Sequence, residues 1–358
     1  MAEPLKDAYD ETYLRRLGAA VAAHHRGFSP RRFTVAVFDA DWAQRELKAR
    51  MRHISSCLHQ ELRLPYPEAL AVLMAAAPAF GGYHAMLFPD YVECHGLDHW
   101  DDSMAALAHF TRYSSAEFAV RPFIRRDPER ALRQLRQWSE SADEHLRRLA
   151  SEGSRPRLPW AEALPLFKRD PRPVLPILDR LRADPSAYVR RSVANHLNDI
   201  AKDNPDVTLA WAQRFRGSHP HTDWIIKHGC RTLLKRAHPE ALALFAYGAA
   251  AHVEVRRLKL SEAAVAIGDS FEFELALRGA PALGRLRLEY GIDFVKAGGQ
   301  WSRKLFKLAE GDFSEAERVF RKRHSFRQMT TRHHYPGRHQ LVIAINGAVV
   351  KTKRFELL

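Results

Sequence analysis

The sequence has few cysteines, and its apolar runs are short. Cys57, Cys94 and Cys230 are the only three in 358 residues, and no C-x-x-C pair occurs. This set excludes a disulfide framework and a cysteine zinc site, and it is typical of free thiols in a reducing compartment. The longest apolar run, residues 69–80, is too short to span a bilayer. Residues 1–7 are polar and include acids, unlike a signal peptide. We therefore expect a cytoplasmic protein.

The common catalytic motifs are also absent. The sequence has no G-x-x-x-x-G-K-[ST] phosphate loop, G-x-G-x-x-G fingerprint, G-x-S-x-G elbow or H-E-x-x-H helix. His333, His334 and His339 form a histidine cluster, but no carboxylate or thiolate lies near them in the sequence. We interpret this cluster as a solvated or phosphate-facing loop rather than a metal site.

Positive charge is in clear excess. The chain has 56 Lys and Arg against 42 Asp and Glu, a formal net charge of +14 and a pI near 9.9. Such a surface attracts phosphate or acidic lipid, although a protein with surplus arginine and no polyanionic partner would have the same composition. The apolar fraction of 46% is that of a globular protein, and the length favours two domains.

The first 250 residues have the apolar spacing of short helices. From about residue 9 to residue 247 the apolar positions recur at helical spacing, broken by Pro, Gly or Asp. Many of the predicted helices are too short to be stable alone and must pack in pairs. The predicted ranges are 11–25, 41–62, 66–78, 101–112, 115–125, 127–139, 142–152, 160–167, 171–183, 186–202, 206–216, 222–235 and 238–247.

A loose repeat recurs within this helical region. Pro128, Pro171, Pro205 and Pro239 each open a helix, and the residues before them (127, 170, 204 and 238) are separated by 43, 34 and 34 positions. These intervals are typical of two-helix HEAT-like repeats, which stack into a solenoid with a concave face. A non-repetitive helical domain is the alternative, because the repeats share little beyond the proline and the spacing.

After residue 250 the period of the apolar pattern changes to two. Residues 270–277 alternate strictly, and similar runs lie near 253–261, 284–296, 303–309, 317–328, 339–345 and 348–357. Asn346-Gly347 between the last two is a strong hairpin signal. About seven strands in about a hundred residues predict an immunoglobulin-like sandwich that lacks the antibody disulfide. The predicted fold is therefore multidomain: an all-α HEAT-like repeat solenoid (1–250) followed by an all-β immunoglobulin-like sandwich (251–358).

The second helices of the predicted repeats carry charges four residues apart, which places them on one face. The stripes are Glu117, Arg121 and Arg125; Arg148 and Glu152; Arg191, Asn195 and Asp199; and Lys227, Arg231 and Lys235. Together they would form a basic ladder that follows a phosphate backbone, with carboxylates set inside it. Spacing alone favours ordinary ion pairs on a solvated face, whereas a carboxylate kept in an anion-binding groove suits a reaction that develops positive charge.

Trp160 ends a stiff run, Arg155-Pro156-Arg157-Leu158-Pro159. Its ring could stack on a base or cap a core, and the sequence alone favours core capping.

At these same residues the sequence resembles the AlkC-type DNA alkylation-repair glycosylases, a HEAT-like-repeat group that includes the related AlkD type. The matching stretches are residues 108–123, 147–160 and 188–199. The resemblance covers the helical region and extends to the immunoglobulin-like domain of some members. One departure is His196, where a second Asn is expected.

The resemblance implies a monofunctional DNA glycosylase that acts on cationic alkylated bases, chiefly 3-methyladenine and also 3-methylcytosine, without metal or organic cofactor. It implies that Glu117, Glu152, Trp160 and Asp199 surround the lesion. A fixed carboxylate would stabilise the oxocarbenium-like sugar and orient water, and an aromatic face would hold the cationic base. The competing hypothesis is a non-catalytic HEAT-like scaffold that binds DNA or protein.

The expected partner is double-stranded DNA with alkylated bases, bound by a monomer that contacts no membrane. Residues 296–340 hold eleven Lys or Arg against four acids, so the sandwich is expected to add DNA contacts, with a packing role as the alternative. The predicted DNA-binding residues are Arg148, Arg155, Arg157, Arg190, Arg191, Lys202, Lys227, Arg231, Lys235, Arg323, Arg332 and His333.

Overall fold

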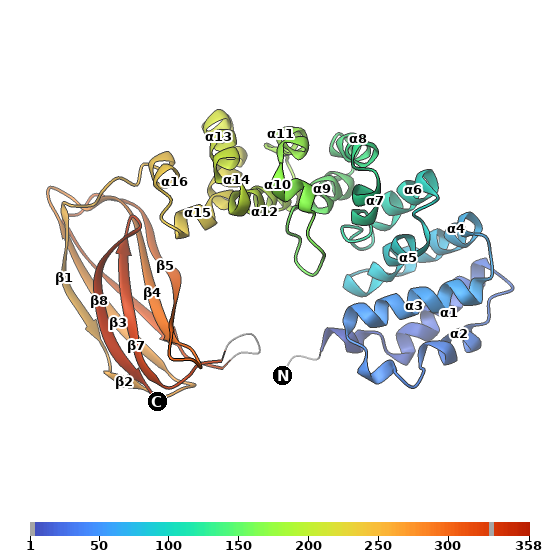
Figure 1. Ribbon diagram of the computed structural model, residues 1–358, viewed down its shortest axis with the longest axis horizontal. Helices are drawn as coiled ribbons and strands as arrows, with labels where there is room; N and C mark the ends of the chain where they lie inside the picture. The colour runs from blue at the N-terminus through green and yellow to red at the C-terminus, as the bar shows by residue number, and fades with distance from the viewer. Residues whose placement is uncertain (1–3, 329–332) are drawn as a thin grey trace. The chain divides into compact units, whose positions relative to one another are not determined.

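The protein is described by a computed structural model for residues 4–328 and 333–358, which divides into two compact units, one ending at Gly229 and one beginning at Cys230. Figure 1 shows the helices of the first unit following one another in succession and the strands of the second forming a sandwich. The predicted order of a helical array and then a β-sandwich is confirmed.

The first unit is built from short helices that pack in pairs. Capping by polar side chains and proline in the first turn start many of them; Asp127, for example, accepts a hydrogen bond from the backbone N–H of Arg130 at the start of α8. The helices are α1 (Glu11–His24), α2 (Pro30–Val37), α3 (Leu47–Leu62), α4 (Tyr66–Ala76), α5 (Leu87–His95), α6 (Trp100–Phe110), α7 (Arg121–Arg126), α8 (Pro128–Ser139), α9 (Glu144–Gly153), α10 (Pro165–Arg169), α11 (Leu175–Leu181), α12 (Ala187–Asp203), α13 (Pro205–Phe215) and α14 (Pro220–Gly229).

The second helices of the predicted repeats stack on one another. α9 packs against α12, and α12 packs against α14, while α8, α11 and α13 pack as their first-helix partners. The apolar side of α12 is fully buried, with Val189, Val193 and Leu197 spaced four residues apart. This stacking brings charged residues from α9 and α12 into one region.

The second unit contains two short helices and a β-sandwich. The helices are α15 (Arg231–Lys235) and α16 (Pro239–Leu244). One sheet has the order β1-β3-β6 and the other β2-β8-β7-β4-β5. The strands are β1 (Val253–Leu260), β2 (Ala264–Val265), β3 (Ser270–Gly279), β4 (Gly284–Val295), β5 (Trp301–Phe313), β6 (Glu317–Ser325), β7 (Gly337–Ile345) and β8 (Ala348–Leu357). All pairs are antiparallel except the short β2–β8 pair.

The alternation read from residues 270–277 does fill the core of the sandwich. Phe271, Phe273, Leu275 and Leu277 on β3 all point inward and are buried. The β7–β8 turn is Asn346-Gly347 with φ of 48° and 84°, the positive values that a two-residue type I′ hairpin requires. The predicted hairpin is confirmed.

Several predicted helices are corrected. α2 and α5 were not predicted, although Ser29-Pro30 supplies a capping signal for α2. The predicted helix 115–125 begins only at Arg121, so Glu117 lies in a turn and is not on a helical face with Arg121 and Arg125. The predicted helix 222–235 ends at Gly229 and a new one begins at Arg231, so Lys227, Arg231 and Lys235 do not form one continuous stripe.

Within residues 4–328 and 333–358, no helix is both long enough and apolar enough to cross a membrane. None of the three cysteines, all of which are described, forms a disulfide.

Candidate active site

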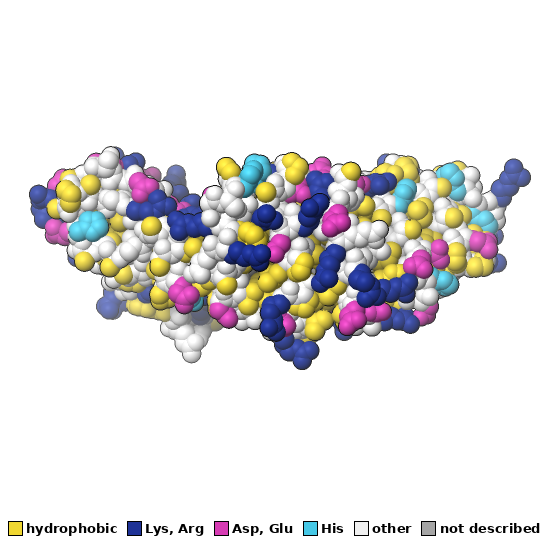
Figure 2. Space-filling model, turned by 90° about the horizontal axis from the view of Figure 1, so that it is seen from above, with side chains coloured by type: hydrophobic (Ala, Val, Ile, Leu, Met, Phe, Trp, Pro, Cys, Tyr) yellow, Lys and Arg dark blue, Asp and Glu magenta, His cyan; other side chains and the backbone are white. Residues whose placement is uncertain are grey.

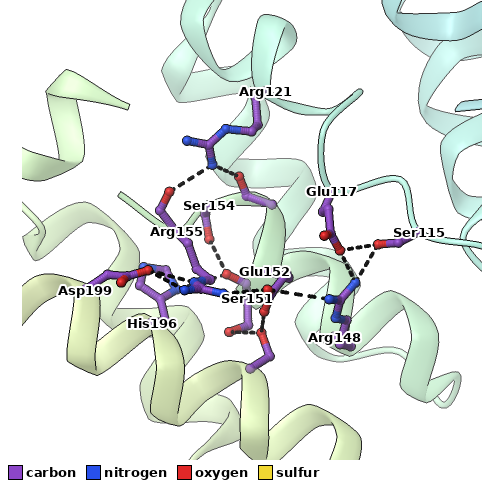
Figure 3. A network of polar contacts seen from close by, with 12 residues as sticks. Ser115, Glu117, Arg121, Arg148, Ser151, Glu152, Ser154, Arg155, His196 and Asp199 are labelled. Atoms are coloured by element: carbon purple, nitrogen blue, oxygen red, sulfur yellow. Dashed lines mark hydrogen bonds and ion pairs between the residues drawn. The ribbon is translucent and has the colours of Figure 1, made fainter. Parts of the chain in front are cut away.

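A chain of alternating acidic and basic side chains runs through the first unit (Figure 3). It begins at Glu117 in the turn before α7, continues through Arg148 and Glu152 on α9 and Arg155 just after α9, and ends at Asp199 on α12. These residues come from elements up to 82 positions apart, and the α9–α12 packing is what brings them together. The structure therefore gathers the three predicted carboxylates into one network.

Glu117 is held at one end of this network. Its carboxylate accepts hydrogen bonds from the Arg148 guanidinium and from the Ser115 hydroxyl. Arg148 also lies over the ring of Tyr188, with its guanidinium carbon 5.0 Å from the ring centroid. Glu117 is thus bound by Arg148 from another element, rather than by Arg121 as the spacing suggested.

Glu152 and Asp199 share Arg155. Arg155 donates Nη1 to Glu152 Oε1 at 2.6 Å and Nε to Asp199 Oδ2 at 2.7 Å. The other Glu152 oxygen accepts from the Ser192 hydroxyl at 2.6 Å, and the other Asp199 oxygen accepts from Lys202 Nζ at 2.8 Å. The Asp199 side chain is 1% exposed, whereas that of its partner Lys202 is 35% exposed.

The ion pairs of the network offset the burial of its two arginines. Burial opposes the charge of Arg148, but Glu117 and Glu152 outweigh it and raise the pKa of Arg148. Burial likewise opposes the charge of Arg155, and Glu152 and Asp199 raise its pKa. The three carboxylates face three cations, Arg148, Arg155 and Lys202. The carboxylates expected inside a basic ladder do lie among basic side chains, and they are paired with them, including the predicted i,i+4 pair of Arg148 and Glu152.

His196 packs beside this network without joining its charge. Its Nδ1 lies 2.9 Å from the carbonyl oxygen of Ser151, and its Nε2 is buried without a hydrogen-bond partner in the described structure. Complete burial, with Arg155 nearby, lowers the pKa of His196 to about 3. The ring is therefore neutral, and it occupies the place where Asn was expected.

Trp160 does not cap a core, so that interpretation is wrong. It lies on the connector, defined here as residues 154–162, which leaves α9 immediately after Gly153. The Trp160 side chain is 66% exposed and its φ is +64°, a left-handed conformation that costs a non-glycine residue about 1–2 kcal/mol. An exposed aromatic ring on a strained connector suits contact with a ligand better than structural support.

Two of the predicted DNA-binding arginines belong to the network, Arg155 buried and Arg148 half-buried. Arg155 is 6% exposed, and Arg148 is engaged by Glu117 and Glu152, so both position acids and offer little surface to a phosphate. Arg190 donates to the carbonyl oxygens of Asp184 and Pro185.

The more exposed predicted cations lie on α12, the connector and the following helices. Arg157 forms an ion pair with Asp203, Lys202 pairs with Asp199, and Arg191 is exposed on α12. Lys227 on α14 and Arg231 on α15 are partly exposed, and Lys235 is exposed. Figure 2 shows Lys and Arg side chains on one face in separate groups, interspersed with acidic and apolar ones.

In the sandwich, the predicted contact residues have different surroundings. Arg323 on β6 and His333 are exposed, and Arg332 lies outside the described residues. His334 and His339 are buried, and His339 stacks on Phe355, so the prediction of a solvated or phosphate-facing loop is wrong for these two. No cluster of three or more potential metal ligands is found in the described parts of the chain.

Sequence reasoning missed the role of Arg121. Its side chain is 4% exposed and donates to the carbonyl oxygens of Gly153, Arg155 and Glu162. The signal was an arginine inside the otherwise apolar run 119–124, because a cation flanked on both sides by buried residues needs internal acceptors. Ser192, which binds Glu152, carried no comparable signal.

Comparison with known proteins extends over the whole chain. A family model described as DNA alkylation repair enzyme matches residues 111–237, and one described as the C-terminal Ig-like domain of the uncharacterised protein YhaZ matches residues 254–358. The chain is 46% identical to the uncharacterized protein YhaZ of Bacillus subtilis over 354 residues, covering 99% of both chains.

A solved structure is also similar along its full length. It is the Pseudomonas fluorescens alkylpurine DNA glycosylase AlkC bound to DNA containing an abasic site analog. The TM-score is 0.95 and the sequence identity 38%, and the match covers 99% of this chain and 100% of the other.

Proposed function

Because this chain belongs to the AlkC family of DNA alkylation-repair glycosylases, we propose that it removes cationic N3-alkylated bases from double-stranded DNA. The proposed substrates are 3-methyladenine and 3-methylcytosine. The observation that carries this proposal is the buried chain Glu117–Arg148–Glu152–Arg155–Asp199 beside an exposed tryptophan. The enzyme acts as a monomer and without a metal or organic cofactor.

The chemistry of the lesion explains the carboxylates. An N3-alkylated base carries a positive charge, so it leaves as a neutral molecule when the bond to C1′ breaks and its nitrogen keeps the electron pair. The positive charge then lies on the deoxyribose, in an oxocarbenium-like state. Water adds its oxygen to C1′ and releases a proton to solvent, which leaves an abasic site and an intact strand.

In this proposal Asp199 stabilises the sugar cation and orients the attacking water. Arg155 fixes Asp199 from the buried side, and preorganisation of this kind makes electrostatic stabilisation effective. Lys202 covers the other oxygen of Asp199, and on DNA it turns to a backbone phosphate.

Glu152, which shares Arg155 with Asp199, and Glu117 at the far end of the network support Asp199 in this proposal. Arg148 joins them, which fixes both carboxylates relative to Asp199 through Arg155. Trp160 lies against the damaged base, where its ring favours a cationic base over a neutral one.

The deciding experiment is release of free base. Purified protein is incubated with DNA methylated by a reagent that forms 3-methyladenine and 3-methylcytosine, and the soluble bases are identified by mass spectrometry. We expect both bases in the supernatant, none from unmodified DNA, and strand breaks only after alkali. Tight binding to methylated DNA without release of any base would instead establish a non-catalytic scaffold.

A further inference from the structure

Arg121 is a buried cation whose described hydrogen bonds all go to backbone carbonyl oxygens. Nη1 donates to Gly153 at 3.0 Å and to Arg155 at 2.8 Å (Figure 3). Nε and Nη2 donate to Glu162 at 3.1 and 2.6 Å. Burial, with the charge of Arg155 nearby, lowers the pKa of Arg121 to about 10. Keeping such a charge inside a protein is costly, and these bonds are what offset the cost.

The carbonyls that Arg121 binds lie at the two ends of the connector. Gly153 and Arg155 stand where the chain leaves α9, and Glu162 stands just beyond Trp160. Gly153 permits this approach, because a Cβ there would lie 2.5 Å from Cγ1 of Val120. One planar guanidinium therefore ties together the two ends of the connector, and Trp160 lies two residues before the end at Glu162.

The connector buries Leu158 in the core, but it borders a hollow on the side of Arg121. A hollow of about 250 Å³ lies there, lined by Lys48, Phe118, Arg121, Arg125, Ala161 and Glu162 among others. Across it, Lys48 of α3 donates Nζ to the carbonyl oxygen of Trp160 at 2.9 Å and lies over the ring of Phe118. Trp160 is thus held in its left-handed conformation by the turn that the Ala161 N–H closes on the Leu158 carbonyl oxygen at 3.3 Å and by the bond from Lys48, while Arg121 holds the residues on either side of this turn.

We propose that Arg121, assisted by Lys48, is a positioning residue that fixes Trp160 for lesion recognition. The inference rests on the proposed function for what Trp160 does, but not for how the connector is held. A lysine at position 121 keeps the positive charge but lacks the planar set of guanidinium N–H donors that binds carbonyl oxygens at both ends of the connector. Arg121→Lys therefore frees Trp160; because Arg121 also binds the backbone of Arg155, which holds Asp199 and Glu152, the double variant described below separates an effect through Trp160 from an effect on these acids.

The chain contains a matched control for this substitution. Arg147 on α9 also binds a loop through two carbonyl oxygens, those of Ser141 and Ala142, and pairs with Asp184. The loop it holds does not carry Trp160. Arg147→Lys removes a similar set of guanidinium hydrogen bonds from the same unit. It therefore reports the purely structural effect of losing such bonds.

The first test needs no DNA. Chymotrypsin cleaves after aromatic residues, and mass spectrometry of the fragments measures nicking between Trp160 and Ala161. We expect Arg121→Lys to raise the nicking rate roughly tenfold, because several hydrogen bonds are lost, and Lys48→Met to raise it about threefold. Arg147→Lys should be nicked at the wild-type rate. Equal rates in wild type, Arg121→Lys and Lys48→Met would overturn the proposal.

The second test asks whether Arg121 acts through Trp160. Single-turnover excision is compared for Arg121→Lys, Trp160→Ala and the double variant. We expect the double variant to be no slower than Trp160→Ala, whereas Arg147→Lys and Trp160→Ala should multiply their effects. If the effects of Arg121→Lys and Trp160→Ala multiply as well, Arg121 does not act by positioning Trp160. If the wild type releases no base, the proposed function is refuted, but the nicking experiment still tests whether Arg121 and Lys48 hold the connector. Should Arg121→Lys fail to fold, the same cycle is run with Lys48→Met.

Discussion

Both units bury ion pairs, but they use them differently. In the sandwich, Arg287 binds Glu289 two residues along β4 at 2.7 Å and Glu310 on the adjacent strand β5 at 3.2 Å, where the strands already share backbone hydrogen bonds. In the helical unit, the chain from Glu117 to Asp199 joins a turn, two helices and the connector, which no sheet holds together. Both networks reach solvent through a lysine, Lys202 in the helical unit and Lys307 in the sandwich. Burial of charge is therefore not in itself a sign of a functional site; what sets the helical network apart is that it joins separate elements and includes Arg155 of the connector that carries the exposed Trp160.

The largest expected effect is on chemistry at Asp199. Asp199→Asn removes the charge but keeps the shape, so the oxocarbenium-like sugar loses its stabilisation. Loss of one preorganised group of this kind costs about 3–4 kcal/mol, or roughly a hundred- to thousand-fold in rate. We expect single-turnover excision of 3-methyladenine to slow by that factor, with Glu117→Gln behaving alike. Full activity in both variants would refute the assigned roles.

The matching substitution in the sandwich should affect stability and not chemistry. Glu289 is 1% exposed, and Glu289→Gln leaves the Arg287 guanidinium with Glu310 as its remaining carboxylate. The expected loss is about 1–3 kcal/mol in the free energy of unfolding, measured by urea denaturation. Single-turnover excision at a temperature where the variant is folded should equal that of the wild type. A large loss of excision would show that the two buried networks are not as different as the structure indicates.

The architecture was readable from the sequence because it depends on local patterns. The change of period near residue 250, the prolines at the starts of α8, α13 and α16, and the turn at Asn346 are all local signals. The break between Gly229 and Arg231 was missed because the apolar spacing continues across it.

The site was only partly readable. Resemblance identified Glu117, Glu152 and Asp199, but their pairing with Arg148 and Arg155 depends on how α9 packs on α12. The exposure of Trp160 and the burial of His334 and His339 also depend on tertiary structure. Spacing along one helix could not give these, because each partner lies on another element.

Buried His196 makes the helical unit sensitive to acid, as His324 does in the sandwich, where burial lowers its pKa to about 4. The unfolded chain protonates His196 below about pH 6.5, whereas burial lowers the folded pKa to about 3, so the unfolded state binds more protons between these values and stability falls as the pH falls. Between pH 7 and pH 5 the loss is about 2 kcal/mol. His196→Asn should remove this part of the pH dependence in urea titrations at both pH values. The exposed His333→Asn is the control, and an unchanged pH dependence in His196→Asn would show that the ring is solvated in the folded state.

The smallest expected effect concerns Lys202 and the salt dependence of DNA binding. If Lys202 leaves Asp199 for a phosphate, Lys202→Met lowers the slope of log affinity against log salt by about 0.9. Asp199→Asn should then raise DNA affinity when Lys202 is present, because Lys202 no longer has to break its ion pair with Asp199 to reach a phosphate. The same substitution should raise DNA affinity less in the Lys202→Met background. Equal gains in the two backgrounds would mean that Lys202 stays on Asp199 in the complex.

Arg323→Met extends the comparison to the sandwich. If the slope of log affinity against log salt falls by about 0.9 in this variant, Arg323 contacts a phosphate. If the slope does not change, the phosphate contacts tested belong to the helical unit alone.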